Sequence, residues 1–272
     1  MPTDLRYVGA NGSVELCGDG AYAGAAEGLR GHAWSFSAAY RNPRRALAEV
    51  EIPVWFADDE AADSLRRIAD ADVSSERPGR FEAAGGWSQR AYIAGFEPSN
   101  VTPNGVHGVV NAVLLDGAWR RYDTVQFSPS TSTGAASLDL PHDLPNDIAP
   151  PPASSSVIVD SLVPAHVKLI AYGPVQTPYV VIAGNTYKVD VHVPDGGYLT
   201  VDPFSEPKRV YITDSQGNET DCFSAASRGE GAGGGSYIFE KLPPGTHDVS
   251  WSNSFSFDLV VGVEEGAPPW TS

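Results

Sequence analysis

Hydrophobic and polar residues alternate along segment 46–56, which is the period of a β-strand. One face is apolar throughout and consists of Ala48, Val50, Ile52, Val54 and Phe56. The opposite face consists of Leu47, Glu49, Glu51, Pro53 and Trp55. Because Pro53 has no amide hydrogen to donate, we expect this strand to lie at a sheet edge or to be bulged near its end.

A helix of about residues 58–73 is predicted directly after this strand. Asp58 can accept hydrogen bonds from the first helical amides, and Asp59 and Glu60 follow where the helix dipole favours negative charge. Apolar residues recur at helical spacing as a narrow stripe, namely Ala61, Leu65, Ile68, Ala69 and Val73. Pro78 and Gly79 end the segment. The pattern predicts one helix packed on a β-sheet.

The segment 106–115, VHGVVNAVLL, is predicted to be a longer strand with apolar residues on both faces. One face carries Val106, Val110, Ala112 and Leu114, and the other carries Val109, Val113 and Leu115. Both faces of such a strand require cover. One can face the domain core, and the other either a neighbouring subunit or a second layer of the same domain. Val109, Val113 and Leu115 are therefore candidate oligomer contacts. Further strands are predicted at 34–36, 91–96 and 119–127.

Residues 129–156 are rich in proline and serine and are predicted to be a linker between a first domain, 1–128, and a second, 157–272. Asp143 and Asp147 lie here with one histidine and a third carboxylate, a set that can be drawn as a metal site. Turns marked by the neighbouring prolines explain the same residues more simply. We expect no metal and no cofactor.

Ten short strands separated by turn residues are predicted in the second domain, which indicates an antiparallel sandwich. They are 157–162, 167–172, 179–182, 187–193, 198–201, 209–214, 221–224, 237–241, 247–251 and 255–263. The whole chain is thus expected to be mainly β with one packed helix.

Composition and charge narrow the function. The 272 residues are 42% hydrophobic, carry a formal charge of −16 and include only two cysteines, which we expect to be reduced thiols. No basic stripe is present for phosphate binding, so we expect no specific nucleic-acid binding. No apolar run is long enough to span a membrane and no secretion signal is apparent, so we expect neither membrane insertion nor export by the usual route.

Catalytic motifs are missing from the sequence, which has neither GxSxG nor HExxH, and we expect no enzymatic activity. A carbohydrate-binding module is an alternative, since Trp251 and Asn253 lie in the predicted sandwich and pair an aromatic ring with a hydrogen-bonding side chain. In a sandwich core, however, a buried tryptophan is commoner than an exposed sugar platform.

The order and spacing of several segments resemble the distal tail proteins of long-tailed phages with flexible tails. The segments are EVEIPVWF, SLRRIAD, GAWRRYD, DLPHDLPND, YLTVD, VYITDSQGN and FEKLPPGTHDVSW, and together they extend over nearly the whole chain. The resemblance implies an N-terminal split β-barrel with a packed helix, and a C-terminal galectin-like antiparallel sandwich. It implies no catalytic residues.

The resemblance also implies a role. Distal tail proteins form a hexameric ring that continues the tail tube, so the expected partners are further copies of the chain, the tail tube protein, the tape measure protein and a tail-tip or receptor-binding protein. The expected location is the virion tail tip, after assembly in the host cytoplasm. The acidic charge would suit a lumen through which DNA slides. It would equally suit solubility.

Overall fold

The computed structural model describes residues 4–31, 34–36, 44–129, 155–205, 207–229, 231 and 233–270. Two compact units make up the chain: Met1–Tyr122 with Glu264–Ser272, and Asp123–Val263. The last segment therefore belongs to the first unit, whereas the sequence had suggested a second domain of 157–272. The division falls within two strands, β11 Trp119–Phe127 and β22 Phe257–Glu265, so each of them contributes residues to both units.

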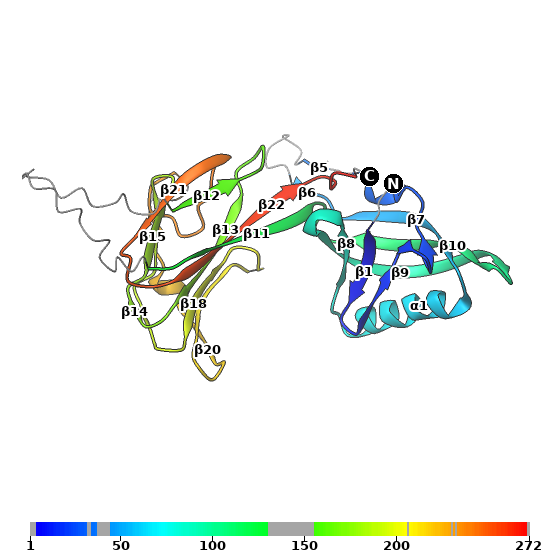
Figure 1. Cartoon of the computed structure of the whole chain (residues 1–272), viewed down its shortest axis with the longest axis horizontal. Helices are drawn as coiled ribbons and strands as arrows, with labels where there is room; N and C mark the ends of the chain where they lie inside the picture. The colour runs from blue at the N-terminus through cyan, green and yellow to red at the C-terminus, as the bar shows by residue number, and fades with distance from the viewer. Residues whose placement is uncertain are drawn as a thin grey trace, which may run out of the picture. The chain divides into compact units, whose positions relative to one another are not determined.

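The described residues of the first unit form a β-structure with one α-helix (Figure 1). Its elements are β1 Leu5–Gly9, β2 Gly12–Glu15, β3 Cys17–Gly18, β4 Ala21–Tyr22, η1 Glu27–Leu29, β5 Trp34–Ser35, β6 Arg44–Arg45, β7 Ala48–Phe56, α1 Asp59–Ser74, β8 Gly79–Ala83, η2 Ala84–Gly86, β9 Trp87–Thr102, β10 Gly105–Leu114 and β11 Trp119–Phe127. The long strand β9 joins two sets of strands, because its first residues pair with β8 and its later residues pair with β10.

Strand β7 shows the alternation expected from the sequence. Ile52, Val54 and Phe56 are buried, whereas Glu51 and Pro53 are exposed. Strand β10 pairs with β7 along its whole length, but among the described residues the other edge of β7 has a strand partner only near Phe56, where β4 joins it. The edge position expected from the proline is therefore confirmed for most of the strand.

Helix α1 begins as predicted. The Asp58 carboxylate accepts a hydrogen bond from the Ala61 amide at 2.8 Å. The predicted apolar stripe is partly wrong, because Val73 is exposed and the buried positions are instead Ala62, Leu65, Ala69 and Asp72. The helix is turned so that a carboxylate occupies the last buried position.

Asp72 is completely buried and has partners that explain its position. One carboxylate oxygen accepts a hydrogen bond from the Tyr7 hydroxyl at 2.8 Å, and the other accepts one from the Ala10 amide at 2.8 Å. Burial, with the hydrogen bond to Asp72 next in size, raises the pKa of Tyr7. A Cβ on Gly9 or Gly79 would lie 2.4 Å from this pair, so both positions require glycine. The helix is thus fixed to β1 by a polar contact inside an apolar core.

In the described part of the second unit the strands form two main antiparallel sheets, as the sequence predicts, and a small antiparallel pair. Its elements are β12 Ser156–Val159, β13 His166–Tyr172, β14 Val175–Gln176, β15 Tyr179–Ile182, β16 Asn185–Lys188, β17 His192–Val193, β18 Tyr198–Asp202, β19 Arg209–Thr213, β20 Glu219–Asp221, η3 Phe223–Ala225, β21 Gly245–Trp251 and β22 Phe257–Glu265. One main sheet has the order β20-β19-β18-β13-β22 and continues to β11, and the other has the order β12-β21-β15-β16. The small pair is β14–β17.

Aromatic rings join these two sheets. Phe257 stacks on Phe127 with ring centroids 4.7 Å apart, and its edge meets Trp251 at 5.1 Å. Phe255 lies 5.7 Å from Phe257 in the same cluster. This aromatic cluster forms one end of the sandwich core.

The prediction of a strand is wrong for two segments of this unit. Segment 237–241 is a turn, because the Asn185 side chain accepts from the Tyr237 amide at 3.1 Å and donates to its carbonyl at 3.0 Å. That side chain therefore takes both hydrogen bonds that a neighbouring strand would have made. Segment 221–224 ends a strand and enters the short helix η3.

Candidate assembly surfaces

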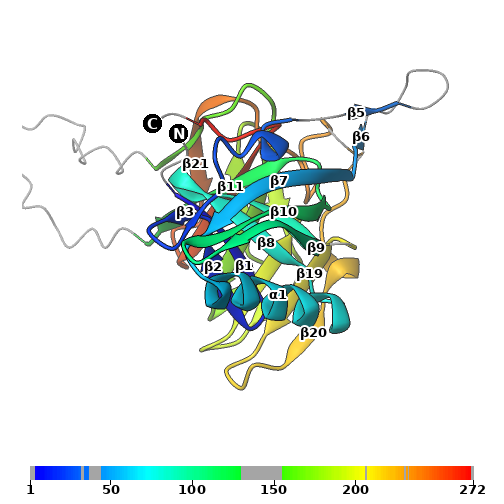
Figure 2. The ribbon, with the colours of Figure 1, turned by 90° about the vertical axis from the view of Figure 1, so that its right-hand side faces the viewer.

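A two-stranded arm, β5–β6, projects from the first unit (Figure 2). Trp34 is 45% exposed and Phe36, which follows β5, is 56% exposed. The Arg45 guanidinium lies 4.1 Å from the centre of the Trp34 ring, an arrangement that holds a positive charge beside an apolar surface. Leu47, just after β6, is also exposed at 58%. The arm thus concentrates apolar side chains that have not been buried within this chain.

The sheet face formed by β7, β10 and β9 on the side away from the buried residues is called here the valine–glutamate face. Val109 and Val113 of β10 are half-buried there, and each lies across from a β7 residue, Pro53 and Glu49 respectively. Glu51 lies between them, opposite Asn111. Glu49 and Glu51 are exposed and form no ion pair with a described residue. Apolar and acidic groups therefore alternate over this face.

Leu115 occupies a different environment from the two valines. It lies just beyond the end of β10, is half-buried, and donates its amide hydrogen to the Arg90 carbonyl at 2.9 Å. Of the three candidate contacts, only Val109 and Val113 thus lie within the valine–glutamate face.

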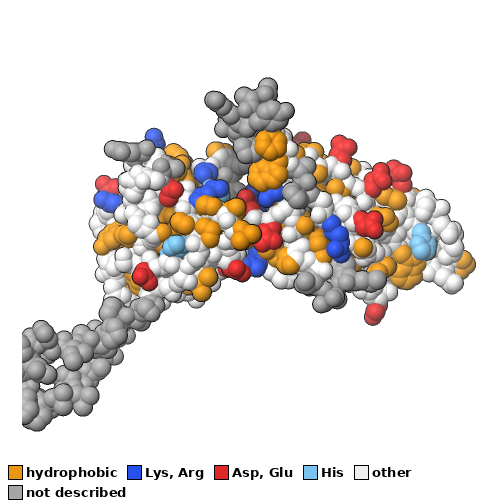
Figure 3. Space-filling model, turned by 90° about the horizontal axis from the view of Figure 1, so that it is seen from above, with side chains coloured by type: hydrophobic (Ala, Val, Ile, Leu, Met, Phe, Trp, Pro, Cys, Tyr) orange, Lys and Arg blue, Asp and Glu red, His pale blue; other side chains and the backbone are white. Residues whose placement is uncertain are grey.

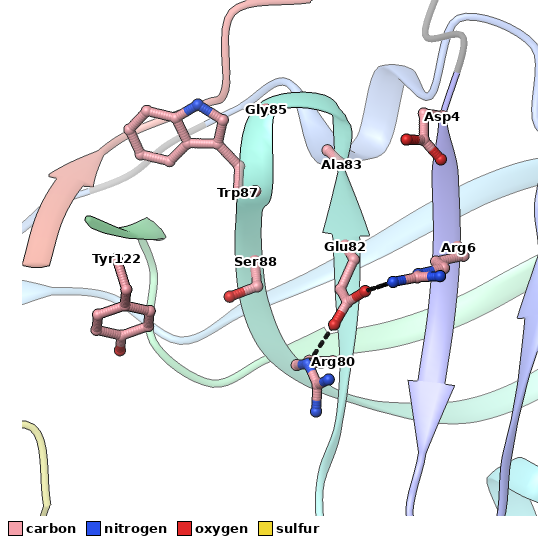
Figure 4. A pocket seen from close by; sticks show the side chains of 10 residues that line it. Asp4, Arg6, Arg80, Glu82, Ala83, Gly85, Trp87, Ser88 and Tyr122 are labelled. Atoms are coloured by element: carbon pink, nitrogen blue, oxygen red, sulfur yellow. Dashed lines mark hydrogen bonds and ion pairs between the residues drawn. The ribbon is translucent and has the colours of Figure 1, made fainter. Parts of the chain in front are cut away.

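A charge ladder crosses β1, β8 and β9 of the same unit (Figure 4). Glu82 accepts hydrogen bonds from Arg6 and Arg80, each at 2.6 Å. Burial alone would raise the pKa of Glu82, but these two arginines outweigh burial and lower it. Arg80 lies directly opposite Arg90, and the repulsion is relieved because Arg90 binds Asp116 at 2.6 Å.

The ladder forms one wall of a cavity of about 490 Å³. Asp4, Trp87, Ser88 and Tyr122 complete much of the lining, and Figure 4 shows them around the ladder. Because carboxylates of the same unit already neutralise the arginines, the cavity offers little positive charge to an anionic ligand.

The sequence-derived metal candidates, Asp143 and Asp147, lie outside the described residues. Within the described part of the chain, no group of three or more His, Cys, Asp or Glu side chains is arranged to hold a metal ion.

In the view of Figure 3, Lys and Arg side chains are dispersed among acidic and apolar ones. None of the described helices has the length and apolar character needed to cross a membrane.

Trp251, the aromatic candidate for a glycan contact, is a packing residue of the second unit. Its ring meets Phe127 at 5.9 Å and Phe257 at 5.1 Å, and its indole N–H donates to the Phe255 carbonyl at 3.2 Å. Asn253 follows in an exposed turn with a positive φ of 57°. The two residues do not present an open ring beside a free amide.

The arm was missed as a surface in the sequence. Residues 34–36 were expected to be a short strand, and their sequence pattern does not distinguish Trp34 and Phe36 from aromatic residues of a hydrophobic core. Only the burial of the folded chain identifies them as exposed.

Comparison with known proteins places this fold. No protein-family model matches the chain, and no curated protein matches it. Solved structures match over nearly its full length. The Dit protein of phage SPP1, described as a paradigm of the hub adsorption apparatus in phages infecting Gram-positive bacteria, has a TM-score of 0.53 and 11% identity, covering 96% of this chain and 98% of its own.

A chain of the phage P2 baseplate, in its activated conformation with calcium, has a TM-score of 0.59 and 10% identity, covering 97% of this chain and 99% of its own. The same baseplate with strontium gives a TM-score of 0.55 and 9% identity, covering 97% and 99%. The chain therefore has the mainly β fold of phage hub and baseplate proteins. The resemblance found in the sequence is confirmed at the level of the fold.

Proposed function

We propose that this protein is a structural component of a phage tail tip, a distal tail protein whose copies form a hexameric ring. The observation that carries the proposal is the match of fold to hub and baseplate proteins along nearly the whole length of both chains. A match confined to one unit would support only a shared domain. A match over both units supports a shared architecture, and hence a shared structural role without catalysis.

In this proposal the ring joins the tail tube protein and the tape measure protein to a tail-tip or receptor-binding protein. The protein assembles in the host cytoplasm and remains in the virion. A ring of identical copies requires two different surfaces on each copy, so that one surface of each copy meets the other surface of the next.

The arm and the valine–glutamate face are the two surfaces that we propose to meet. The arm offers Trp34, Phe36 and the cationic Arg45. The face offers half-buried valines between carboxylates that lack a described ion-pair partner. Apolar groups thus meet apolar groups, and the charges are opposite in sign.

Single-residue variants test this contact. Val109→Asp and Val113→Asp each place a carboxylate where the proposed contact buries apolar side chains, and they are expected to convert rings to monomers, as measured by light scattering and negative-stain microscopy. Val163→Asp is the matched control, because Val163 is an exposed valine in the second unit. Rings that persist in both variants would move the contact elsewhere.

A charge exchange tests the pairing itself. Arg45→Glu is expected to weaken the ring, and adding Glu51→Arg is expected to restore it.

The wild-type protein should form rings on its own or with its tail partners. A chain that stays monomeric at high concentration and beside the tail tube protein would refute the ring.

A further inference from the structure

The outward face of the β20-β19-β18-β13-β22 sheet in the second unit is rich in tyrosine. Along β13, Val167, Leu169 and Ala171 are buried in the sandwich, so the residues between them point outward. Tyr172, directly after Ala171, points to the same side as these outward residues and is 38% exposed. We refer to this outward surface as the tyrosine face.

Strand register places three tyrosines on this face. Tyr172 lies directly opposite Tyr198 of β18, and their ring centroids are 6.3 Å apart. Tyr198, which is 36% exposed, lies in turn opposite Thr213 of β19. Tyr211, two residues before Thr213, is on the same side of the strand, and the Arg209 guanidinium lies 4.4 Å from its ring centre.

Two ion pairs lie on the face. Lys168 contacts Asp202 at 3.2 Å and Arg209 contacts Glu219 at 2.6 Å. Asp258 accepts a hydrogen bond from the Tyr172 hydroxyl at 2.7 Å. These contacts hold the polar ends in place, while the Tyr172 and Tyr198 rings stay partly exposed and the Tyr211 ring is half-buried beside Arg209.

The face also includes a buried hydroxyl group, that of Thr213, which makes no hydrogen bond with any described residue. Only 6% of the Thr213 surface is exposed, and its side-chain oxygen Oγ1 is buried. Because it lies opposite Tyr198 in the antiparallel ladder, its side chain is on the same side of the sheet as that tyrosine. A buried hydroxyl without a partner is unfavourable, and a ligand or water reaching it would remove the penalty.

We propose that the tyrosine face binds a neutral oligosaccharide. Sugar rings have apolar faces that pack on aromatic rings, and their hydroxyls need donors and acceptors held at fixed positions; tyrosine, aspartate and arginine supply both. Diagonal neighbours on adjacent strands are about 7–8 Å apart, so Tyr198 and Tyr211 span roughly two sugar rings.

Charge selects the ligand class. The face holds two basic side chains, Lys168 and Arg209, and both already contact carboxylates. Asp258 contributes a further negative charge. A polymer of phosphate groups would meet acidic groups and no uncommitted cation, whereas a neutral sugar meets only hydrogen-bonding groups.

The test is binding of the full-length protein to an array of neutral di- to hexasaccharides built from glucose, galactose, rhamnose and N-acetylglucosamine, followed by calorimetric titration of the best glycan. Tyr198→Ala and Tyr211→Ala are each expected to weaken binding at least tenfold. Tyr179→Ala is the matched control, because Tyr179 is equally exposed at 37% but belongs to the other sheet. It should bind like the wild type.

Poly(glycerol phosphate) serves as the anionic probe and is expected not to bind. The proposal is overturned if no neutral glycan binds the wild type, if Tyr179→Ala weakens binding as much as Tyr198→Ala, or if the phosphate polymer binds more tightly than any neutral glycan. If no glycan binds and Tyr198→Ala instead abolishes binding of a tail protein, the tyrosine face is a protein-docking surface and the glycan proposal is wrong. Ring formation is measured separately on the same variants, so failure here leaves the ring proposal untouched.

Discussion

The buried contact between Tyr7 and Asp72 gives a quantitative prediction. Asp72→Ala removes a fully buried carboxylate that accepts hydrogen bonds from the Tyr7 hydroxyl and the Ala10 amide, each at 2.8 Å. Hydrogen bonds to a charged group are worth about 1.5–3 kcal/mol each. Ala10 is exposed, so its amide can donate to water once the carboxylate is removed. We therefore expect a loss of about 2–4 kcal/mol in the free energy of unfolding of this unit.

A double-mutant cycle isolates the pair. Tyr7→Phe removes the donor and is expected to destabilise the unit by about 2 kcal/mol. The double variant Tyr7→Phe, Asp72→Ala is expected to be only as unstable as Asp72→Ala alone, because the hydroxyl no longer needs the lost partner. Asp70→Ala is the control on the exposed side of the same helix, and it should change stability by less than about 0.5 kcal/mol.

The assay must report on one unit at a time, because a chain with two compact units has no single unfolding free energy. Hydrogen exchange of peptides from α1 and β1, measured over a urea series, gives the stability of that region. If the effects of Tyr7→Phe and Asp72→Ala simply add, the hydroxyl and carboxylate do not act on one another. The account of the buried contact would then be wrong.

Three further outcomes are expected. Asp58→Ala removes the cap of α1 and should destabilise the helix by about 1 kcal/mol in the same exchange assay. The hydrogen bond to Asp258, and then burial, raise the pKa of Tyr172 to about 12. The stability that the Tyr172–Asp258 hydrogen bond gives the second unit should therefore be complete below pH 10 and decline as the pH rises through about 12. Ultraviolet titration should show a lower pKa of Tyr172 in the Asp258→Asn variant. Asn185→Ala removes the acceptor of the Tyr237 amide hydrogen and should speed exchange of that amide by tenfold or more, whereas the Tyr237 carbonyl keeps its hydrogen bond from the Glu240 amide.

Local signals predicted the elements whose cause is local. The cap residue Asp58 and the charges after it mark the start of α1, and the alternation from Ala48 to Phe56 marks β7. The face of the helix was not predicted correctly, because hydrophobic spacing cannot identify a buried carboxylate. Asp72 is buried because Tyr7 contacts it, and 65 residues separate the two in the chain.

The tyrosine face could not be predicted for a similar reason. Tyr172, Tyr198 and Tyr211 come from three strands, and only the register of those strands shows that they share one side of a sheet. Trp251 looked like the better sugar contact in the sequence, because it has polar neighbours there. The fold instead packs it against Phe127 and Phe257.

The proposed contact between copies also has an expected strength. A Trp or Phe side chain buries about 150–250 Å². Trp34 and Phe36 have roughly half of their surface left to bury, which at about 25 cal/mol per Å² gives about 5 kcal/mol for the pair. Val109 and Val113 are already half-buried and add about 1 kcal/mol each.

This sum is comparable with the estimated 4–15 kcal/mol lost in freezing the motion of two free molecules. One contact alone should therefore bind weakly, and open dimers and trimers should be scarce. Closing a ring adds a final contact without bringing in another free molecule, because both of its surfaces are already held in one assembly. The proposed contact thus favours monomers and complete rings over the intermediates between them, with a steep dependence on protein concentration.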